Sequence, residues 1–115
     1  MALAVKTPQP EKTIEPISCE EEFEKEYLRI INKVIDYLDE ILSGTGIDYE
    51  FIEADKDPVI FDYGIGYLII DAIFYKGGKE IKLPVLKLIL EECRDGYRII
   101  DYKIVVRKED LREIM

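Results

Sequence analysis

The chain of 115 residues has no histidine and no tryptophan, and its uncharged polar residues are few. Asn32 and Gln9 are the only side-chain amides, beside two serines and three threonines. Without histidine, neither a Ser-His-Asp triad nor a zinc site with imidazole ligands can form. The composition therefore excludes the commonest triad hydrolases and gives no support to a metal cofactor.

Cysteine is also scarce, with Cys19 and Cys93 far apart and no Cys-x-x-Cys spacing. Glu91, Glu92 and Asp95 flank Cys93 and oppose ionisation of its thiol, which argues against a nucleophile. We therefore expect two free thiols without a chemical role. A disulfide between them stays open as the alternative, because intracellular proteins of thermophiles do contain such bonds.

Long apolar runs are missing as well. No stretch reaches the length of a membrane span, and Ala2-Leu3-Ala4-Val5 is too short for the core of a signal peptide. Gly64-Ile65-Gly66 lacks the third glycine and the following helix of a dinucleotide fingerprint. We predict a cytoplasmic protein with no membrane partner and no cofactor.

Charge, in contrast, is abundant: 36% of the residues are charged and the net charge is −9. Such a surface repels phosphate backbones, and no Lys/Arg run is longer than the pair Arg107-Lys108, so a nucleic-acid partner is not expected. Many Glu and Lys residues with few amides are also typical of proteins from thermophiles. The sequence thus predicts an acidic, thermophile-like protein.

The chain divides at Ser18. Residues 1–17 contain three prolines and no apolar periodicity, and we interpret them as a flexible N-terminal arm ahead of a single α+β domain over residues 18–115. Ser18 and Glu21 form a capping-box pattern that starts a long helix, and Gly44 is placed to end it. Apolar residues recur in this helix at steps of three and four: Phe23, Tyr27, Ile30, Ile31, Val34, Leu38, Ile41 and Leu42.

Strand patterns follow the helix at residues 47–53, 59–63 and 67–76, and the last has apolar even-numbered residues that we assign to the core. Gly77-Gly78 is a turn of the two-residue type that matches the twist of paired strands. It predicts two cross-strand pairs, Phe74 with Ile81 and Ala72 with Leu83.

The next turn, Arg94-Asp95-Gly96, is interpreted as a three-residue loop with Gly96 in the left-handed conformation. The resulting register pairs Glu92 with Arg98, Leu90 with Ile100, Leu88 with Tyr102 and Leu86 with Ile104. Even-numbered residues of the middle strand then point inward, whereas the first turn requires odd ones. One extra residue near Pro84 to Val85 reconciles the two turns, because a β-bulge switches the facing of all later residues. Leu86 is then expected opposite Ile70, and Leu88 opposite Leu68.

A helix that starts at Pro84 is the alternative for residues 84–95, with Leu86, Ile89, Leu90 and Cys93 on one face and Gly96 at its end. We favour the strand, because Leu83 is a poor helix cap and the apolar run after it suits a strand buried on both faces. The predicted fold is α+β: one long N-terminal helix packed on a bent antiparallel β-meander of about four or five strands. A short C-terminal helix or tail from Lys108 closes it.

This arrangement resembles the cone-shaped folds of the ketosteroid-isomerase-like, or nuclear-transport-factor-2-like, superfamily and its cystatin-like relatives. The resemblance covers about a third of the chain, residues 77–110, where it consists of the glycine hairpin, Glu80-Ile81-Lys82-Leu83-Pro84, Arg94-Asp95-Gly96-Tyr97-Arg98-Ile99 and the closing Val105-Val106-Arg107-Lys108-Glu109-Asp110-Leu111. The family's usual extra N-terminal helices have no counterpart in this sequence. The resemblance implies a pocket between helix and sheet and often a homodimer through the outer sheet face. It selects no reaction, since the family includes isomerases, dehydratases, ligand binders and dimerisation modules.

The residues themselves also predict a dimer. On the register above, the sheet face turned away from the helix carries more apolar side chains than a monomer usually exposes. The interface candidates are Tyr67, Ile69, Ile73, Tyr75, Ile89, Ile99 and Val105. We therefore expect a non-catalytic binding or assembly module that forms a homodimer. A different protein as the partner stays open.

Two enzymatic alternatives remain. A small-molecule enzyme or binding protein would use the helix-to-sheet cavity, with a desolvated carboxylate as acid or base, and the candidates are Asp71, Asp62 and Asp101. If the Pro84 helix forms, Asp71 with Glu80-Ile81-Lys82 resembles the metal-binding motif of PD-(D/E)XK nucleases. Against a nuclease, Glu80 and Lys82 lie near the hairpin turn, roughly 13 Å from Asp71 at about 3.3 Å per residue.

Overall fold

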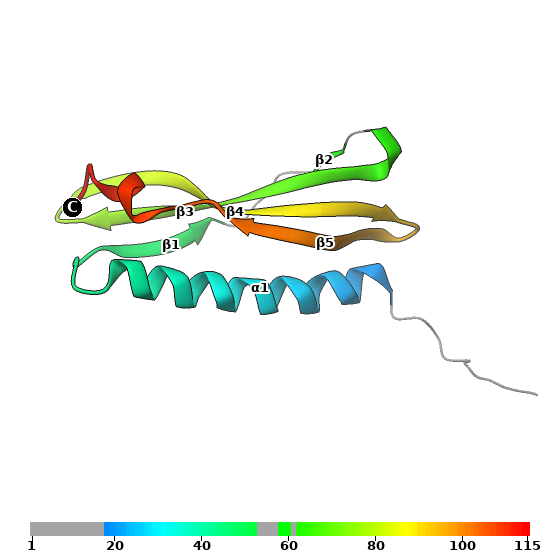
Figure 1. The fold of residues 1–115 in the computed structure, drawn as a ribbon, viewed down its shortest axis with the longest axis horizontal. Helices are drawn as coiled ribbons and strands as arrows, with labels where there is room; N and C mark the ends of the chain where they lie inside the picture. The colour runs from blue at the N-terminus through cyan, green and yellow to red at the C-terminus, as the bar shows by residue number, and fades with distance from the viewer. Residues whose placement is uncertain (1–17, 53–57, 61) are drawn as a thin grey trace, which may run out of the picture.

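One long helix lies along one face of an antiparallel sheet in this protein (Figure 1). The fold is known from a computed structural model, which describes residues 18–52, 58–60 and 62–115. The predicted α+β class is confirmed. The predicted arm, residues 1–17, and Glu53, the last residue of the first predicted strand, lie outside the described residues.

Helix α1 (Cys19–Leu42) begins and ends where the sequence predicts. The Ser18 hydroxyl oxygen accepts a hydrogen bond of 3.2 Å from the backbone N–H of Glu21. Glutamates fill the first turn, where negative charge stabilises the positive end of the helix dipole. Gly44 has a φ of 77°, which lets the chain turn away after the last helical residue.

The sheet has the strand order β1-β3-β4-β5, and the short β2 also pairs with β3. The strands are β1 (Asp48–Ile52), β2 (Val59–Ile60), β3 (Ile65–Lys76), β4 (Lys79–Cys93) and β5 (Gly96–Ile104). β1 pairs with the second half of β3 and β2 with its first half, so both lie along the same edge. β2 is shorter than predicted, because the chain enters a 3₁₀ turn at Asp62–Gly64.

Residues 84–93 form a strand. β4 runs through Pro84 to Cys93, so the alternative helix is wrong. Four predicted pairs are confirmed: Phe74 with Ile81, Ala72 with Leu83, Ile70 with Leu86 and Leu68 with Leu88. The register shifts between Ile70 and Asp71, which leaves Val85 as one extra residue in β4. The predicted bulge therefore exists at the predicted place.

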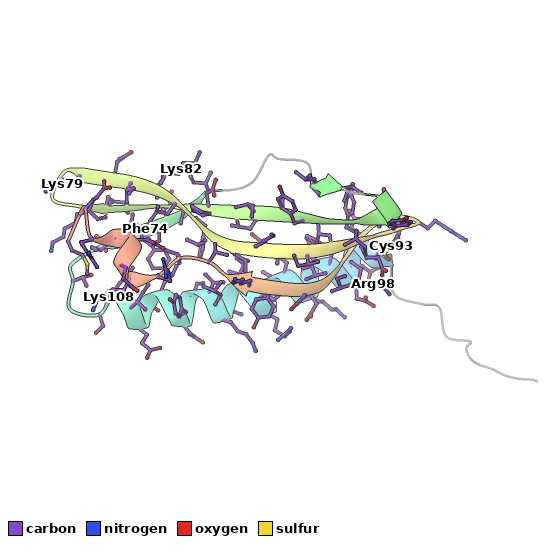
Figure 2. All side chains as sticks on the ribbon, turned by 45° about the horizontal axis from the view of Figure 1, so that its top comes forward. Phe74, Lys79, Lys82, Cys93, Arg98 and Lys108 are labelled. Atoms are coloured by element: carbon purple, nitrogen blue, oxygen red, sulfur yellow. A yellow bond between two sulfur atoms is a disulfide. The ribbon has the colours of Figure 1, made fainter. Side chains whose placement is uncertain are left out.

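The bulge lets β4 turn an apolar side to the same core along its whole length. Leu83 packs against the core before the bulge and Leu86 lies within the core after it, while Val85 is itself fully buried. The Val85 carbonyl accepts a hydrogen bond of 2.9 Å from the N–H of Val105, so the interrupted ladder leaves this group satisfied. Figure 2 shows β4 crossing β3 near the middle of the pair, as the added twist of a bulge requires.

The second hairpin differs from the prediction. Its loop has two residues, Arg94 and Asp95, because Cys93 pairs with Gly96. A two-residue loop suits the twist of the flanking strands, which is the physical reason for the shorter turn. The predicted pairs Leu90 with Ile100 and Glu92 with Arg98 are wrong. The structure pairs Leu90 with Ile99 and Glu91 with Arg98.

A second bulge in β5 corrects the register farther along. The shift lies between Ile89 and Leu90 of β4 and leaves Ile100 as the extra residue of β5. The remaining predicted pairs, Leu88 with Tyr102 and Leu86 with Ile104, are therefore confirmed. Ile99, predicted on the outer face, lies instead in the core with 8% of its surface exposed.

The hydrophobic core lies between α1 and the inner face of the sheet. Its fully buried members include Ile30, Val34, Leu38, Phe74, Leu86, Leu88 and Leu90. The C-terminal segment covers the core at the end of the molecule that holds the turn between β3 and β4. Its 3₁₀ turn, Lys108–Leu111, confirms the predicted short helix, and Ile114 after this turn is also buried. The Tyr37 hydroxyl donates a hydrogen bond of 3.0 Å to the Val106 carbonyl and joins α1 to this segment.

Two changes at Val85 test the bulge. Deleting Val85 would move the side chains of one half of β4 to the opposite face of the sheet, because a one-residue slip reverses the facing of every residue after it. We therefore expect the deletion variant to lose its cooperative unfolding transition. Val85→Ala keeps the residue count and should lower the free energy of unfolding by only about 1.5–3 kcal/mol. Circular dichroism during denaturant unfolding checks both, and a deletion variant as stable as Val85→Ala would contradict the role of the bulge.

Candidate functional site: the outer face of the sheet

The sheet has a second face, directed away from α1, that we call the outer face. Alternation along the paired strands places on it the apolar side chains of Ile52, Val59, Ile65, Tyr67, Ile69, Ile73, Tyr75 and Ile89. Helix α1 and the C-terminal segment both pack against the inner face (Figure 1). Among the described residues, neither of these two elements lies over the outer face, where Val59 and Tyr75 are exposed and the other six apolar side chains are half-buried.

The exposure of this face is substantial. Val59 is 46% exposed and Tyr75 is 40% exposed, although both are large apolar or aromatic residues. Ile69, Ile73 and Ile89 are half-buried by their cross-strand neighbours. The most extended apolar row follows β3, the central strand of the face.

The free edges of the sheet, unlike this face, are protected. The half of β4 that lacks a second partner strand carries exposed Lys79, Glu80, Lys82 and Pro84. The free edge of β5 carries exposed charged residues, Arg98, Asp101 and Lys103. Charged side chains and proline at an edge prevent another strand from adding to it. Association through these edges of β4 and β5 is therefore disfavoured.

The charged groups of the outer face interact with neighbours within the chain. The Lys87 ammonium lies 4.8 Å from the centre of the Tyr67 ring, within the range of a cation–π interaction. Arg98 and Glu91 form a salt bridge across β4 and β5, and the hydrogen bond from this pair raises the pKa of the Arg98 guanidinium. The apolar row is thus bordered by charges that already have partners.

The predicted catalytic carboxylates do not converge. Asp71 is half-buried on the outer face, opposite Ile52 and Pro84. Asp101 is exposed on β5, where its Oδ1 accepts a hydrogen bond of 2.8 Å from the N–H of Tyr102. Asp62 belongs to the 3₁₀ turn before β3, and its side chain is not among those that the structure describes. In the described ranges, no group of three or more His, Cys, Asp or Glu residues could hold a metal ion.

The proposed nuclease residues are also separated. Glu80 and Lys82 are exposed beside the Gly77-Gly78 turn, whereas Asp71 pairs with Pro84, four residues from Glu80. This spacing corresponds to roughly 13 Å along the strand. Because β4 is a strand, the topology on which the nuclease resemblance depended is absent from the described part of the chain.

Core side chains fill the middle of the space between α1 and the sheet, and two hollows of about 200 and 170 Å³ lie between α1 and residues 95–102. Of the best-defined hollows on the described surface, none is lined by Val34, Leu38, Leu86 or Leu88. A groove of about 400 Å³ does lie where α1 ends, lined by Asp39, Leu42, Ser43, Ile47, Asp48 and Tyr49. It opens to solvent at the margin of the helix and does not reach the predicted helix-to-sheet cavity.

Tyr49 lines this groove, and its titration is shifted. Its hydroxyl donates a hydrogen bond of 3.3 Å to Asp39 Oδ1, and its ring lies against Phe74 with the centroids 6.2 Å apart. Partial burial, with the negative charge of Asp39 second, raises the pKa of Tyr49. The effect opposes formation of a tyrosinate here.

The two cysteines form a disulfide, so the expectation of free thiols is wrong. The bond joins Cys19, the first residue of α1, to Cys93, the last residue of β4, across 74 positions of sequence. Figure 2 shows Cys93 at the end of the molecule opposite Lys79. The chain reverses direction from α1 to β1, from β1 to β3 and from β3 to β4, so the start of α1 and the end of β4 lie at the same end of the molecule. This alternation is a signal in the sequence that could have placed the two cysteines together.

No protein-family model, curated protein or solved structure matches the chain. Within the described ranges, no helix combines the length and the apolar character needed to cross a membrane.

The titration of Tyr49 provides a test of the groove geometry. The difference in alkaline absorbance between the wild type and Tyr49→Phe should show a midpoint above pH 10, because burial and Asp39 both disfavour the tyrosinate. Because folding raises the pKa of Tyr49, the protonated hydroxyl contributes to the free energy of unfolding below about pH 10. This contribution is lost as the pH rises through the pKa of Tyr49 in the folded protein. Asp39→Asn should lower the midpoint in the wild-type background and change nothing in Tyr49→Phe. An unshifted midpoint in the wild type would refute this geometry.

Proposed function

We propose that this protein is a small acidic binding or assembly module without catalytic activity, and that it acts as a homodimer through the outer face of its sheet. The observation that carries the proposal is the apolar row along β3, which α1 leaves uncovered on the opposite side: Tyr75 is 40% exposed, and Tyr67, Ile69 and Ile73 are half-buried. Large apolar patches with a polar border mark protein contact surfaces. A second copy of the same face is the simplest partner, because closed dimers bring one patch against itself.

The interface candidates change in part from those that the sequence suggests. Tyr67, Ile69, Ile73, Tyr75 and Ile89 remain on the outer face. Ile99 leaves the set because it is buried in the core. Val105 follows β5, donates its N–H to Val85 and stays a candidate. Ile52, Val59 and Ile65 join through their positions beside the β3 row.

The magnitudes favour a contact that covers the whole row. Fully burying one Ile or Val side chain contributes about 1.5–3 kcal/mol, and these side chains are already half-buried in the monomer. Loss of translational and rotational freedom on association costs about 4–15 kcal/mol. A stable dimer therefore requires most of the eight apolar side chains listed above to be covered together. Two sheets packed face to face, as in a β-sandwich, provide such coverage.

The resemblance to the ketosteroid-isomerase-like superfamily supports the same arrangement by analogy, since dimers through the outer sheet face are common there. We propose a cytoplasmic setting in a thermophilic organism, because the composition is thermophile-like and intracellular disulfides occur in such organisms. The alternative of a small-molecule enzyme or binding protein is weaker, since core side chains occupy the space that its ligand would need. The nuclease alternative has no supporting observation left.

The oligomeric state tests the proposed function. At micromolar concentration, light scattering coupled to size exclusion should give twice the chain mass of 13.4 kDa for the wild type. Ile69→Glu should weaken the dimer by about 100-fold or more, because the interface would bury a carboxylate. Lys87 lies opposite Ile69, so the folded monomer tolerates this substitution.

Leu28→Glu is the matched control. Leu28 is 59% exposed on α1, on the other side of the molecule, and its replacement should leave the mass unchanged. A monomeric wild type would refute the homodimer, and equal loss of the dimer in both variants would refute its location on the outer face.

A further inference from the structure

The first three turns of α1, residues 19–29, make few apolar contacts. The fully buried residues of the helix begin at Ile30 and continue with Val34 and Leu38. Before them, Phe23 and Tyr27 are only partly buried, and they stack on each other with ring centroids 6.1 Å apart. Packing therefore stabilises this end of the helix much less than the other end.

Charge also opposes the docking of this end. Residues 20–29 contain five glutamates and two basic residues, and the facing hairpin, residues 91–98, contains three acidic and two basic residues. Both segments are thus net negative. Arg98 lies close to Glu22 but is already bound to Glu91. Two favourable interactions counter the repulsion: Asp95 Oδ1 accepts a hydrogen bond of 3.4 Å from the N–H of Cys19, and Arg98 attracts Glu22.

A covalent bond lies at this weak contact. The Cys19–Cys93 disulfide joins the beginning of α1 to the end of β4, and both cysteines are half-buried, so a reagent in solution reaches them. Both also stand at the ends of their elements. Separating them requires no movement of a buried core residue.

We propose that the Cys19–Cys93 disulfide is a redox-sensitive clamp. In the oxidised protein it holds residues 19–29 on the β4–β5 hairpin. In the reduced protein this segment separates from the hairpin, uncovering the side chains of Phe23, Tyr27 and Tyr97, while the rest of the fold persists. This device is independent of the proposed dimer, since the outer face lies on the opposite side of the sheet.

The reductant is a dithiol. One of its sulfurs, as the thiolate, attacks a sulfur of the protein disulfide and forms a mixed disulfide, and the other cysteine leaves as a thiolate and takes up a proton. The second thiol of the reductant then displaces the remaining cysteine. In total, two electrons and two protons pass from the dithiol to Cys19 and Cys93, and the reductant becomes a disulfide.

The opening is local because the remainder of α1 has its own anchors. Ile30, Val34, Leu38 and Leu42 are buried, and Tyr37 is hydrogen-bonded to Val106. Segments with few buried contacts open at a lower free energy than the core does. Loss of the disulfide therefore affects residues 19–29 first.

Hydrogen exchange measured by mass spectrometry tests the clamp in the full chain. Dithiothreitol should reduce the bond without denaturant, and amides of residues 19–29 should then exchange about tenfold faster or more. Amides of residues 34–42 and 86–90 should keep their rates within about twofold. Cys19→Ser/Cys93→Ser should exchange like the reduced wild type and should not respond to dithiothreitol.

Three results would overturn the proposal. The first is a disulfide that dithiothreitol reduces only after unfolding. The second is equal exchange of residues 19–29 in the oxidised and reduced protein. The third is faster amide exchange along the whole chain in Cys19→Ser/Cys93→Ser, which would show that the disulfide stabilises the entire fold.

Discussion

The extra residue in β4 is the constraint on which the other features depend. β4 is 15 residues long and pairs with β3 from Lys79 to Glu91, so a regular strand would present its apolar residues to α1 in only one half. Val85 removes this conflict by changing which residues face inward. The change gives α1 one continuous surface to pack on. On the opposite surface it places Ile89 beside the row that regular alternation produces along β3.

Much of this arrangement could be predicted because each signal was local or involved two neighbouring strands. Ser18 and Gly44 mark the helix ends, and the glycine pair at 77–78 fixes the register of the first hairpin. The second hairpin could not be predicted correctly, because Ile99 and Ile100 are identical in type. Either residue fits the core, so the hydrophobic pattern does not distinguish a three-residue loop from a two-residue loop followed by a bulge. The two possibilities agree again beyond Ile100, which explains why Leu88 and Leu86 were paired correctly.

The outer face could be predicted for β3 because a long regular strand alternates without ambiguity. The error at Ile99 occurred where alternation is interrupted, beside the second bulge. The disulfide could be given only as an alternative, because contacts between distant elements leave no trace in local composition and acidic neighbours argue only against a reactive thiol. Asp71, Asp101, Glu80 and Lys82 are separated by strand geometry, which composition alone does not reveal.

The hydrogen bond between Val105 and the Val85 carbonyl has a consequence for synthesis of the protein on the ribosome. The group freed by the bulge is satisfied only by residues that come after all five strands, and the buried Leu111 and Ile114 follow later still. Helix α1, made first among the described elements, packs mainly against β5, made last among the strands. Nascent chains therefore expose the apolar stripe of α1 until nearly all of residues 18–114 have left the exit tunnel. Such a fold completes after translation of this region and not during it, so its early intermediates depend on the acidic helix surface for solubility.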